Sequence, residues 1–262
     1  MHSWIGPWDE AQKVYLEQSG FDDLVLKTGL PPLVIYDLGL GIATNALAVL
    51  QRYQALKTRQ PDLRTVNLIS FENNLEGLRL ALENSGQFPF LRPYQRILEK
   101  LLQNRKWTDP SGIEWTLMEG DFRTIDLNTV PRPEIVFYDF YSPKSAPWLW
   151  GVGSFQRLAN LLGPTSPPMR LITYSAATPV RAAMLLAGFY VGLGRATGHK
   201  METTVASTDP DALARPLDAH WIEHYHRSSK KLPLDFTGSD SEARALIEQV
   251  LGSPQFRSRS GS

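Results

Sequence analysis

Cysteine is absent from the 262 residues, which excludes a disulfide framework, a thiolate metal site and a cysteine nucleophile. Long apolar runs are missing too, since no window approaches the roughly 18 uninterrupted apolar residues that a membrane span needs. The N-terminal MHSWIGPWDE has neither the basic start nor the apolar core of a signal peptide. These absences predict a cytoplasmic protein without a membrane segment.

A net charge is also lacking, because 27 Lys and Arg balance 27 Asp and Glu. This gives no support for a protein coated by nucleic acid. The charges are unevenly spread, however, with ten Lys and Arg against five acids between Arg52 and Lys106. That segment is either a phosphate-facing surface or a set of solvated helix faces. The composition, 42% hydrophobic and 21% charged, is ordinary for a globular protein with a sizeable core.

Apolar strands alternate with amphipathic helices along the chain. A buried strand over 33–41 ends in a glycine turn, and helix formers follow from Ala43 to Leu56. Further strands are expected at 65–72, 113–121, 134–139 and 169–175, and the last two, 188–194 and 200–207, are close enough to pair as a hairpin. The pattern predicts an α/β fold: a Rossmann-like, doubly wound, mostly parallel seven-stranded sheet with a terminal antiparallel hairpin. That hairpin favours class I methyltransferase topology, because a dinucleotide dehydrogenase would usually add another strand–helix unit.

The organisation predicted from composition is one main domain with additions. Residues 1–208 form the domain, with a helical insertion at about 87–110. Residues 209–251 form a C-terminal extension packed on it, and the polar segment 252–262 is predicted to be a disordered tail.

Polar residues stand where the predicted strands end, and ligands of open α/β sheets bind at those ends. Gly39 and Gly41 let the backbone turn tightly and approach a ligand, although a G-x-G pair alone is a weak signal. Thr44 holds the position of the third glycine of the dinucleotide fingerprint, which disfavours NAD and leaves S-adenosylmethionine (SAM) favoured. Glu72 suits the ribose hydroxyls of an adenosine, or else it is an acid at a helix N-terminus. Asp121 suits the exocyclic amine of adenine, or else it is a turn or capping residue.

Asp139 is the most distinctive of these acids, because it ends an apolar strand and opens the run DFYSPKSAPWLW. A carboxylate there can orient an amine and take up its proton during methyl transfer to nitrogen. The alternative is that Asp139 only holds the loop. His220, His224 and His226 cluster downstream, but without other ligands we interpret them as surface or packed histidines and expect no metal.

Several segments, in order, resemble those of the MnmC-like methyltransferases, which act on 5-aminomethyl-uridine derivatives at the wobble position of tRNA. The run YDFYSPKSAPWLW is similar to the family signature D-G/P-F-(A/S)-P-K-x-N-P-x-L-W. DLGLGIATNAL, LISFE and MEGDF are similar to its glycine loop, second-strand end and acidic motif, and TYSAATPVRAAMLLAGFYVG and PLDAHWIEHYHRSSKKLP to later segments. The resemblance spans roughly residues 5 to 235.

This resemblance implies a role for each matching residue. Asp139 would be catalytic and face the substrate amine. The SAM-binding set would be Asp37, Gly39, Gly41, Asn45, Glu72 and Asp121, and the substrate-binding set Tyr141, Pro143, Lys144 and Arg181, with Arg181 lying either in the site or in a structural pair. The chain departs from the family at Ala43, Phe140 and Ala146, where many members have Gly, Gly or Pro, and Asn. No oxidoreductase domain follows, so a stand-alone methyltransferase is expected, and relatives carry further residues before the equivalent of Met1.

The leading hypothesis is therefore a SAM-dependent N-methyltransferase with tRNA as its substrate, converting an aminomethyl group on a wobble uridine into methylaminomethyl. Lys and Arg contacts to phosphates would supply affinity, and a flipped-out base would present its amine to Asp139. The alternatives are methylation of a small amine or of another nucleic acid position, and a non-catalytic SAM-binding interaction module. An NAD-dependent oxidoreductase is disfavoured.

Overall fold

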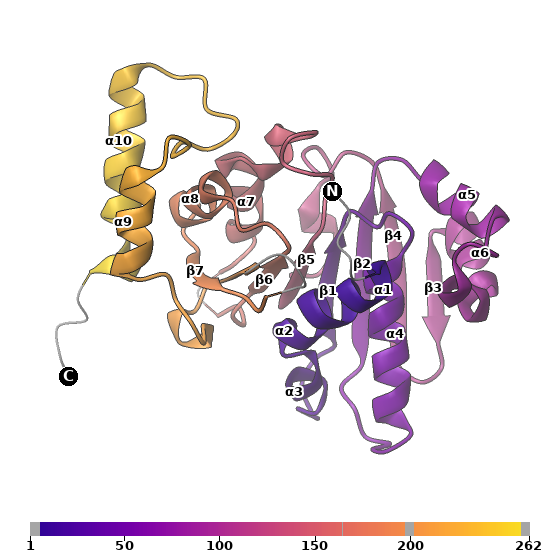
Figure 1. Cartoon of the computed structure of the whole chain (residues 1–262). Coiled ribbons are helices and arrows are strands. Elements are labelled where there is room, and N and C mark those ends of the chain that lie inside the picture. Colours follow the sequence, from indigo (N-terminus) through magenta and orange to yellow (C-terminus); the bar gives the residue numbers. More distant parts are fainter. Residues whose placement is uncertain (1–5, 164, 197–201, 258–262) are drawn as a thin grey trace.

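An eight-stranded sheet forms the centre of the molecule (Figure 1). The computed structural model describes residues 6–163, 165–196 and 202–257. The strands are β1 Leu33–Leu38, β2 Val66–Glu72, β3 Lys106–Asp109, β4 Ile113–Glu119, β5 Ile135–Tyr138, β6 Arg170–Thr173, β7 Tyr190–Leu193 and β8 Thr204–Ser207. Their order is β3-β4-β2-β1-β5-β6-β8-β7. The five strands β4, β2, β1, β5 and β6 are parallel, β3 is antiparallel to β4, and β8 is antiparallel to both β6 and β7. The predicted mostly parallel fold with a terminal hairpin is confirmed.

Helices cover both faces of this sheet. They are α1 Pro7–Glu10, the π-helix η1 Ala11–Leu16, α2 Glu17–Ser19, α3 Phe21–Val25, α4 Thr44–Lys57, α5 Glu76–Glu83, α6 Gln95–Asn104, α7 Val152–Ala159, α8 Thr178–Leu186, α9 Ala219–Arg227 and α10 Asp240–Leu251. Short 3-10 turns are η2 Pro89–Tyr94, η3 Leu127–Thr129, η4 Pro147–Trp150, η5 Pro210–Ala212 and η6 Pro254–Phe256. Residues of the helices up to α6 share one apolar core, and residues of α7 to α10 share a second. All six residues of β1 are buried, as expected for a central strand covered on both faces.

The edge strand β3 is one strand more than the sequence predicted. The predicted helical insertion ran to about residue 110, but α6 ends at Asn104 and Arg105 takes a left-handed φ of 58°. The Arg105 guanidinium binds Leu102 O and pairs with Glu119, which holds this turn. No glycine marks the turn, so the helical sequence pattern continues into residues that pair with β4 in the structure.

The C-terminal helices α9 and α10 lie beyond α8, at the opposite end of the molecule from α5 and α6 (Figure 1). Trp221, Tyr225 and Val250 enter the same core as α7 and α8. The domain division at 208 and 209 stays a prediction. Within the described part of the chain, no helix is long and apolar enough to cross a membrane.

The segment 252–257, predicted as part of a disordered tail, is folded. Phe256 stacks on Trp221 with ring centroids 5.9 Å apart. Gln255 acts as an added edge partner for β7, because its amide accepts from Val191 N at 2.6 Å and donates to Val191 O at 2.7 Å. The polar composition hid these contacts, and residues 258–262 lie outside the described residues.

Candidate methyltransferase site

The glycine turn after β1 is packed against the end of β5. Gly39 has a φ of 88°, and a Cβ built there would lie 2.6 Å from the backbone oxygen of Asp139. Only glycine fits this approach, so Gly39 is required by the chain itself. Gly41 has a φ of 52° and open space around it. The glycine turn, predicted to bind the cofactor, is therefore in direct contact with Asp139, the predicted catalytic acid.

Glu72, at the end of β2, is buried and held by backbone amides. Its Oε2 accepts from Gly41 N at 3.2 Å, and its Oε1 accepts from Asn73 N at 2.9 Å and Asn74 N at 3.0 Å. Each carboxylate oxygen offers more than one acceptor position, so the side chain can still accept from a ligand. The bonds fix its carboxylate beside the glycine turn.

A cavity of about 210 Å³ lies at these strand ends. Its lining combines the glycine turn, acidic residues and aromatic rings: Gly39, Gly41, Phe71, Glu72, Asn73, Gly120, Asp121, Phe122, Asp139, Phe140, Tyr141 and Leu149. Phe122 packs edge-on against Phe71 at 5.7 Å and lies 5.5 Å from Phe140, measured between ring centroids. The structure thus brings together five of the predicted SAM and catalytic residues and adds an apolar wall. The sequence did not single out Phe71 or Phe122.

The Asp121 carboxylate already accepts hydrogen bonds from Arg123. Arg123 pairs with its carboxylate at 2.5 Å and donates a backbone N–H at 2.9 Å. These hydrogen bonds from Arg123 lower the pKa of Asp121, so it is ionised at neutral pH. An ionised carboxylate is an acceptor only, which suits an amine donor such as the exocyclic group of adenine.

Asp139 is oriented by two side chains from distant parts of the sequence. The Tyr15 hydroxyl donates to Oδ1 at 2.6 Å, and the Asn45 amide donates to Oδ2 at 2.9 Å. Tyr15 lies on the π-helix η1, and Asn45 lies in the first turn of α4. Burial is the main cause that raises the pKa of Tyr15 well above its ordinary value, so its hydroxyl stays protonated and can donate.

Neither of the two hydrogen bonds to Asp139 was predicted from the sequence. Asn45 was predicted to bind the cofactor, but its amide contacts Asp139 and it does not line the cavity. Tyr15 was not predicted at all, because it is 124 residues from Asp139 and no motif links them.

Asp37 is completely buried in β1 and is not among the residues that line the cavity. Its Oδ2 accepts from Ser70 at 2.8 Å, and Ser70 in turn accepts from the Trp115 indole at 2.9 Å. Its Oδ1 has no hydrogen-bond partner within the described residues. Burial raises the pKa of Asp37 from 3.8 to about 7. The orphaned oxygen fits a site that a cationic or hydrogen-bonding ligand completes.

This burial predicts how stability depends on pH. The folded protein keeps a proton on Asp37 up to about pH 7, whereas the unfolded chain releases it near its ordinary pKa of 3.8. The free energy of unfolding should therefore fall as pH rises from about 4 to 7 and stay lower above that. Asp37→Asn should remove this loss and be more stable than the wild type at pH 8, by up to about 4 kcal/mol. Urea titrations of both proteins at pH 4, 6 and 8 check this, and parallel pH profiles would count against it.

The predicted substrate residues differ in their position relative to the cavity. Tyr141 lines the cavity, whereas the half-buried Pro143 and the exposed Lys144 lie in a turn just outside it, closed by the 2.8 Å bond from Ser145 N to Ser142 O. Arg181 is not among the residues that line the cavity, and it takes the second of its two expected places, a structural pair.

Arg181 is 3% exposed and is used inside the fold. Its guanidinium donates to Thr204 Oγ1 at 3.0 Å and Thr203 O at 3.1 Å, and it pairs with Glu202 at 3.3 Å. These bonds tie α8 to β8. The family pattern around Arg181 had suggested the strand end, but the helix turns this side chain toward the hairpin.

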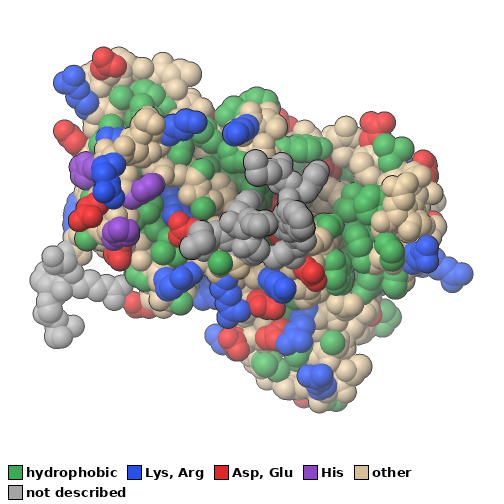
Figure 2. Space-filling model, viewed as in Figure 1, with side chains coloured by type: hydrophobic (Ala, Val, Ile, Leu, Met, Phe, Trp, Pro, Cys, Tyr) green, Lys and Arg blue, Asp and Glu red, His purple; other side chains and the backbone are tan. Residues whose placement is uncertain are grey.

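The basic segment 52–106 contains both ion-paired cations and exposed ones, the latter being Arg59, Arg79, Arg92, Arg96 and Lys100. Arg52 pairs with Asp22, Arg64 with Glu134 at 2.5 Å, and Lys106 with Glu114 at 2.8 Å. On the face shown in Figure 2, basic and acidic side chains are interspersed, and the His side chains gather over the α9 end. No group of metal-ligating side chains occurs among the residues that the structure describes.

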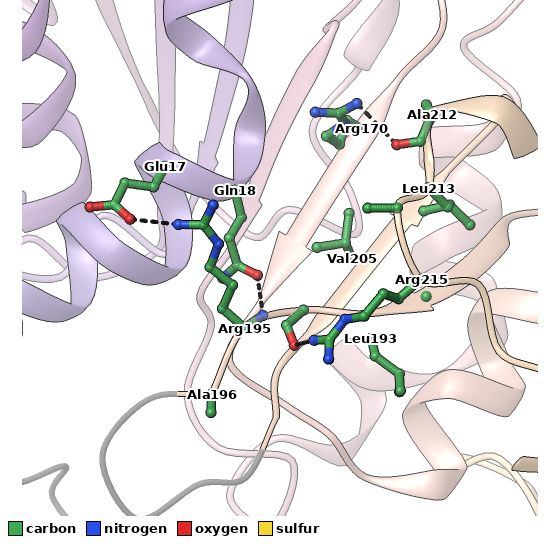
Figure 3. Close-up of a pocket in the computed structure, with 13 residues that line it drawn as sticks. Glu17, Gln18, Arg170, Leu193, Arg195, Ala196, Val205, Ala212, Leu213 and Arg215 are labelled. Carbon is green, nitrogen blue, oxygen red and sulfur yellow. Dashed lines mark hydrogen bonds and ion pairs between the residues drawn. The ribbon is translucent and has the colours of Figure 1, made fainter.

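A larger hollow of about 500 Å³ lies between α2 and the segment before α9 (Figure 3). Its three arginines are bonded to the protein: Arg195 to Glu17 at 3.0 Å, Arg170 to Ala212 O at 3.0 Å, and Arg215 to Gly194 O. It shares no residue with the cavity at Asp139. We interpret these arginines as braces that hold together α2, the hairpin and the segment before α9.

Comparison with known proteins agrees with this geometry. Residues 90–209 match the model of a family described as S-adenosyl-L-methionine-dependent methyltransferase. The bifunctional tRNA 5-methylaminomethyl-2-thiouridine biosynthesis protein MnmC of Cupriavidus necator is 29% identical over 231 residues, covering 86% of this chain and 34% of that protein. The chain is an MnmC-like, SAM-dependent methyltransferase domain.

Two further comparisons show how much of the MnmC relatives this domain matches and which fold it shares. The protein of the same name from Ralstonia nicotianae is 35% identical over 211 residues, covering 79% of this chain and 31% of that protein. The crystal structure of MnmC2 from Aquifex aeolicus superposes with a TM-score of 0.63 at 22% identity, covering 94% of this chain and 75% of that one. The chain thus spans about a third of the length of the curated relatives, and the structural likeness shows the fold.

Proposed function

We propose that this MnmC-like domain methylates a primary amine on a tRNA wobble uridine, converting an aminomethyl group into methylaminomethyl. The observation that carries the proposal is the Asp139 carboxylate, fixed by Tyr15 and Asn45 at the edge of a cavity that also holds Glu72. The substrate class follows from what the relatives in Cupriavidus and Ralstonia are named for. We expect the domain to act in the cytoplasm, where tRNA is modified.

The residues around the cavity fit SAM. Glu72 Oε2 has a free acceptor position for a ribose hydroxyl, Asp121 is an ionised acceptor for an amine, and Phe71 and Phe122 form an apolar wall for a flat base. Asp37, with one orphaned buried oxygen, would complete the polar end. When bound, SAM supplies an electrophilic methyl group on a sulfonium.

Asp139 would act on the attacking amine. The amine must be uncharged, because its lone pair forms the new nitrogen–carbon bond while the methyl–sulfur bond breaks. An Asp139 oxygen can accept a hydrogen bond from the amine and aim its lone pair at the methyl. As the nitrogen becomes positive, the same carboxylate stabilises the charge and takes up the proton that the product amine releases. Tyr15 and Asn45 keep the carboxylate from rotating away.

The substrate would enter past Tyr141, Pro143 and Lys144, and we keep these three as proposed substrate contacts. Affinity for tRNA would come from exposed cations, with the uridine flipped out of its stack. A methyltransferase of small amines would lack the steep loss of RNA affinity with salt that phosphate contacts cause. That salt dependence separates the two alternatives.

Cofactor choice is tested by thermal protection. At a hundred times its dissociation constant, SAM should stabilise the domain by about 2.7 kcal/mol, and NAD at the same concentration should not. Glu72→Gln should weaken the SAM effect, because an amide nitrogen would replace one acceptor oxygen. Glu76→Gln, an exposed change just downstream, serves as the matched control. Equal protection by NAD would contradict the SAM site.

A further inference from the structure

Two exposed aromatic side chains stand beside the cavity, on the loop between β5 and α7. Tyr141 is 67% exposed and Trp148 is 48% exposed. The other large hydrophobic side chains exposed in the described residues are leucines: Leu26, Leu30 and Leu80. Tyr141 lines the cavity directly, and Trp148 is next to the lining residue Leu149. The exposed aromatic surface is thus concentrated at the proposed active site.

The backbone carrying these rings is anchored from below. The indole of the buried Trp150 donates to Tyr141 O at 2.8 Å, and the Ser154 hydroxyl donates to Trp148 O at 3.1 Å. Between them, the Tyr138 hydroxyl donates to Leu149 O. The loop therefore presents its aromatic faces from a fixed backbone, so little conformational entropy is lost when a ligand stacks on them.

A cation accompanies the exposed indole. The Arg123 guanidinium lies 5.8 Å from the Trp148 ring centroid, and it also pairs with Asp121 at 2.5 Å. A row of contacts thus runs from the cavity through Asp121 and Arg123 to Trp148. Exposed aromatic faces beside an arginine are the combination with which proteins bind unpaired nucleotides, because bases stack on the rings and the cation attracts phosphate.

We propose that Trp148, supported by Tyr141 and Arg123, is a stacking platform for an unpaired base of the RNA, next to the nucleotide that enters the cavity. The inference rests on the proposed function and adds a residue that it does not require. In the signature D-G/P-F-(A/S)-P-K-x-N-P-x-L-W, position 148 is unspecified, so the family pattern does not ask for this tryptophan. Duplex RNA buries its base faces and cannot use such a platform.

The test compares Trp148→Ala, Trp148→Phe and the exposed control Leu80→Ala. The probe is a single-stranded RNA with an anticodon-loop sequence, and a duplex of equal length is the comparison. Trp148→Ala should weaken single-strand binding by about 5- to 100-fold, whereas Trp148→Phe and Leu80→Ala should keep most of it. In methyl transfer, Trp148→Ala should raise KM for tRNA and leave kcat and SAM affinity nearly unchanged. RNA binding should quench tryptophan fluorescence in the wild type and much less in Trp148→Phe.

Unchanged affinity for single-stranded RNA in Trp148→Ala overturns the proposal and leaves the exposed aromatic patch to a protein partner. An equal loss of affinity in Trp148→Ala and Trp148→Phe also overturns the proposal. The failure of the two proposals can be told apart. If the wild type binds unpaired RNA through Trp148 but transfers no methyl to aminomethyl-uridine, the proposed substrate is wrong and the platform stands. If it transfers methyl and Trp148→Ala behaves as wild type, the platform is wrong and the function stands.

Discussion

Asp139→Asn is expected to lower methyl transfer by about 10²- to 10⁴-fold while SAM affinity changes little. The variant should fold, because each hydrogen bond has a replacement. The amide oxygen can accept from Asn45, and the amide nitrogen can donate to the Tyr15 hydroxyl, which both donates and accepts. What disappears is the negative charge and the capacity to take up a proton. Single-turnover kinetics with saturating SAM measure the chemical step directly.

The control for this change is Asp62→Asn, an exposed acid in the loop before β2. That loop precedes the strand, so it lies at the opposite edge of the sheet from Asp139. Asp62→Asn should retain wild-type turnover and stability. If Asp139→Asn turned over as fast as this control, Asp139 would only hold the loop and the mechanism would be wrong.

Gly39→Ala should produce the largest loss of stability among the glycine changes at the site. A Cβ at Gly39 would stand 2.6 Å from Asp139 O and 2.9 Å from Asp139 C, both of them backbone atoms. A left-handed alanine costs about 1–2 kcal/mol, and the overpacking adds about 1–3 kcal/mol. The combined loss of roughly 2–5 kcal/mol corresponds to a melting temperature lower by about 5–15 °C. Because the added Cβ must push the glycine turn away from Asp139, we expect Gly39→Ala also to lower the rate of methyl transfer.

Two other glycines serve as controls for this prediction. Gly41 has a left-handed φ of 52°, but its nearest contact would be Gly39 O at 4.0 Å, so Gly41→Ala should cost only about 1–2 kcal/mol. Gly77 lies in α5 with nothing within 4 Å, and Gly77→Ala should stabilise by up to about 1 kcal/mol. Equal losses for Gly39→Ala and Gly41→Ala in urea unfolding would show that the approach to Asp139 is unimportant.

The strand ends were predictable from sequence because parallel strands impose a simple rule. Leu33–Leu38 and Val66–Glu72 are apolar runs ending in a polar residue or a glycine, and the carboxyl ends of parallel strands share one edge. This rule is enough to bring Gly39, Glu72 and Asp139 to one cavity.

The direction in which a side chain points was not predictable by the same rule. Arg181 sits in a segment similar to the family's, yet its guanidinium is consumed by Thr204 and Glu202. Asn45 points to Asp139, which no spacing in the sequence indicates.

Contacts between residues far apart in the sequence were also not predictable. Tyr15 reaches Asp139 only because η1 packs against α4 and β6. The strand β3 depends on a left-handed Arg105, a conformation that composition does not signal. In both places the tertiary packing selects among conformations that the local sequence leaves open.

The measurement that tests the central claim most directly is transfer of labelled methyl from SAM to tRNA that carries 5-aminomethyl-uridine, with fully unmodified tRNA as control. We expect label only in the aminomethyl tRNA, released as the methylaminomethyl nucleoside on digestion, and an initial rate lower by about 10²- to 10⁴-fold with Asp139→Asn. Label in both tRNAs would contradict the proposed amine, and absence of label from both, with SAM binding intact, would contradict the proposed substrate.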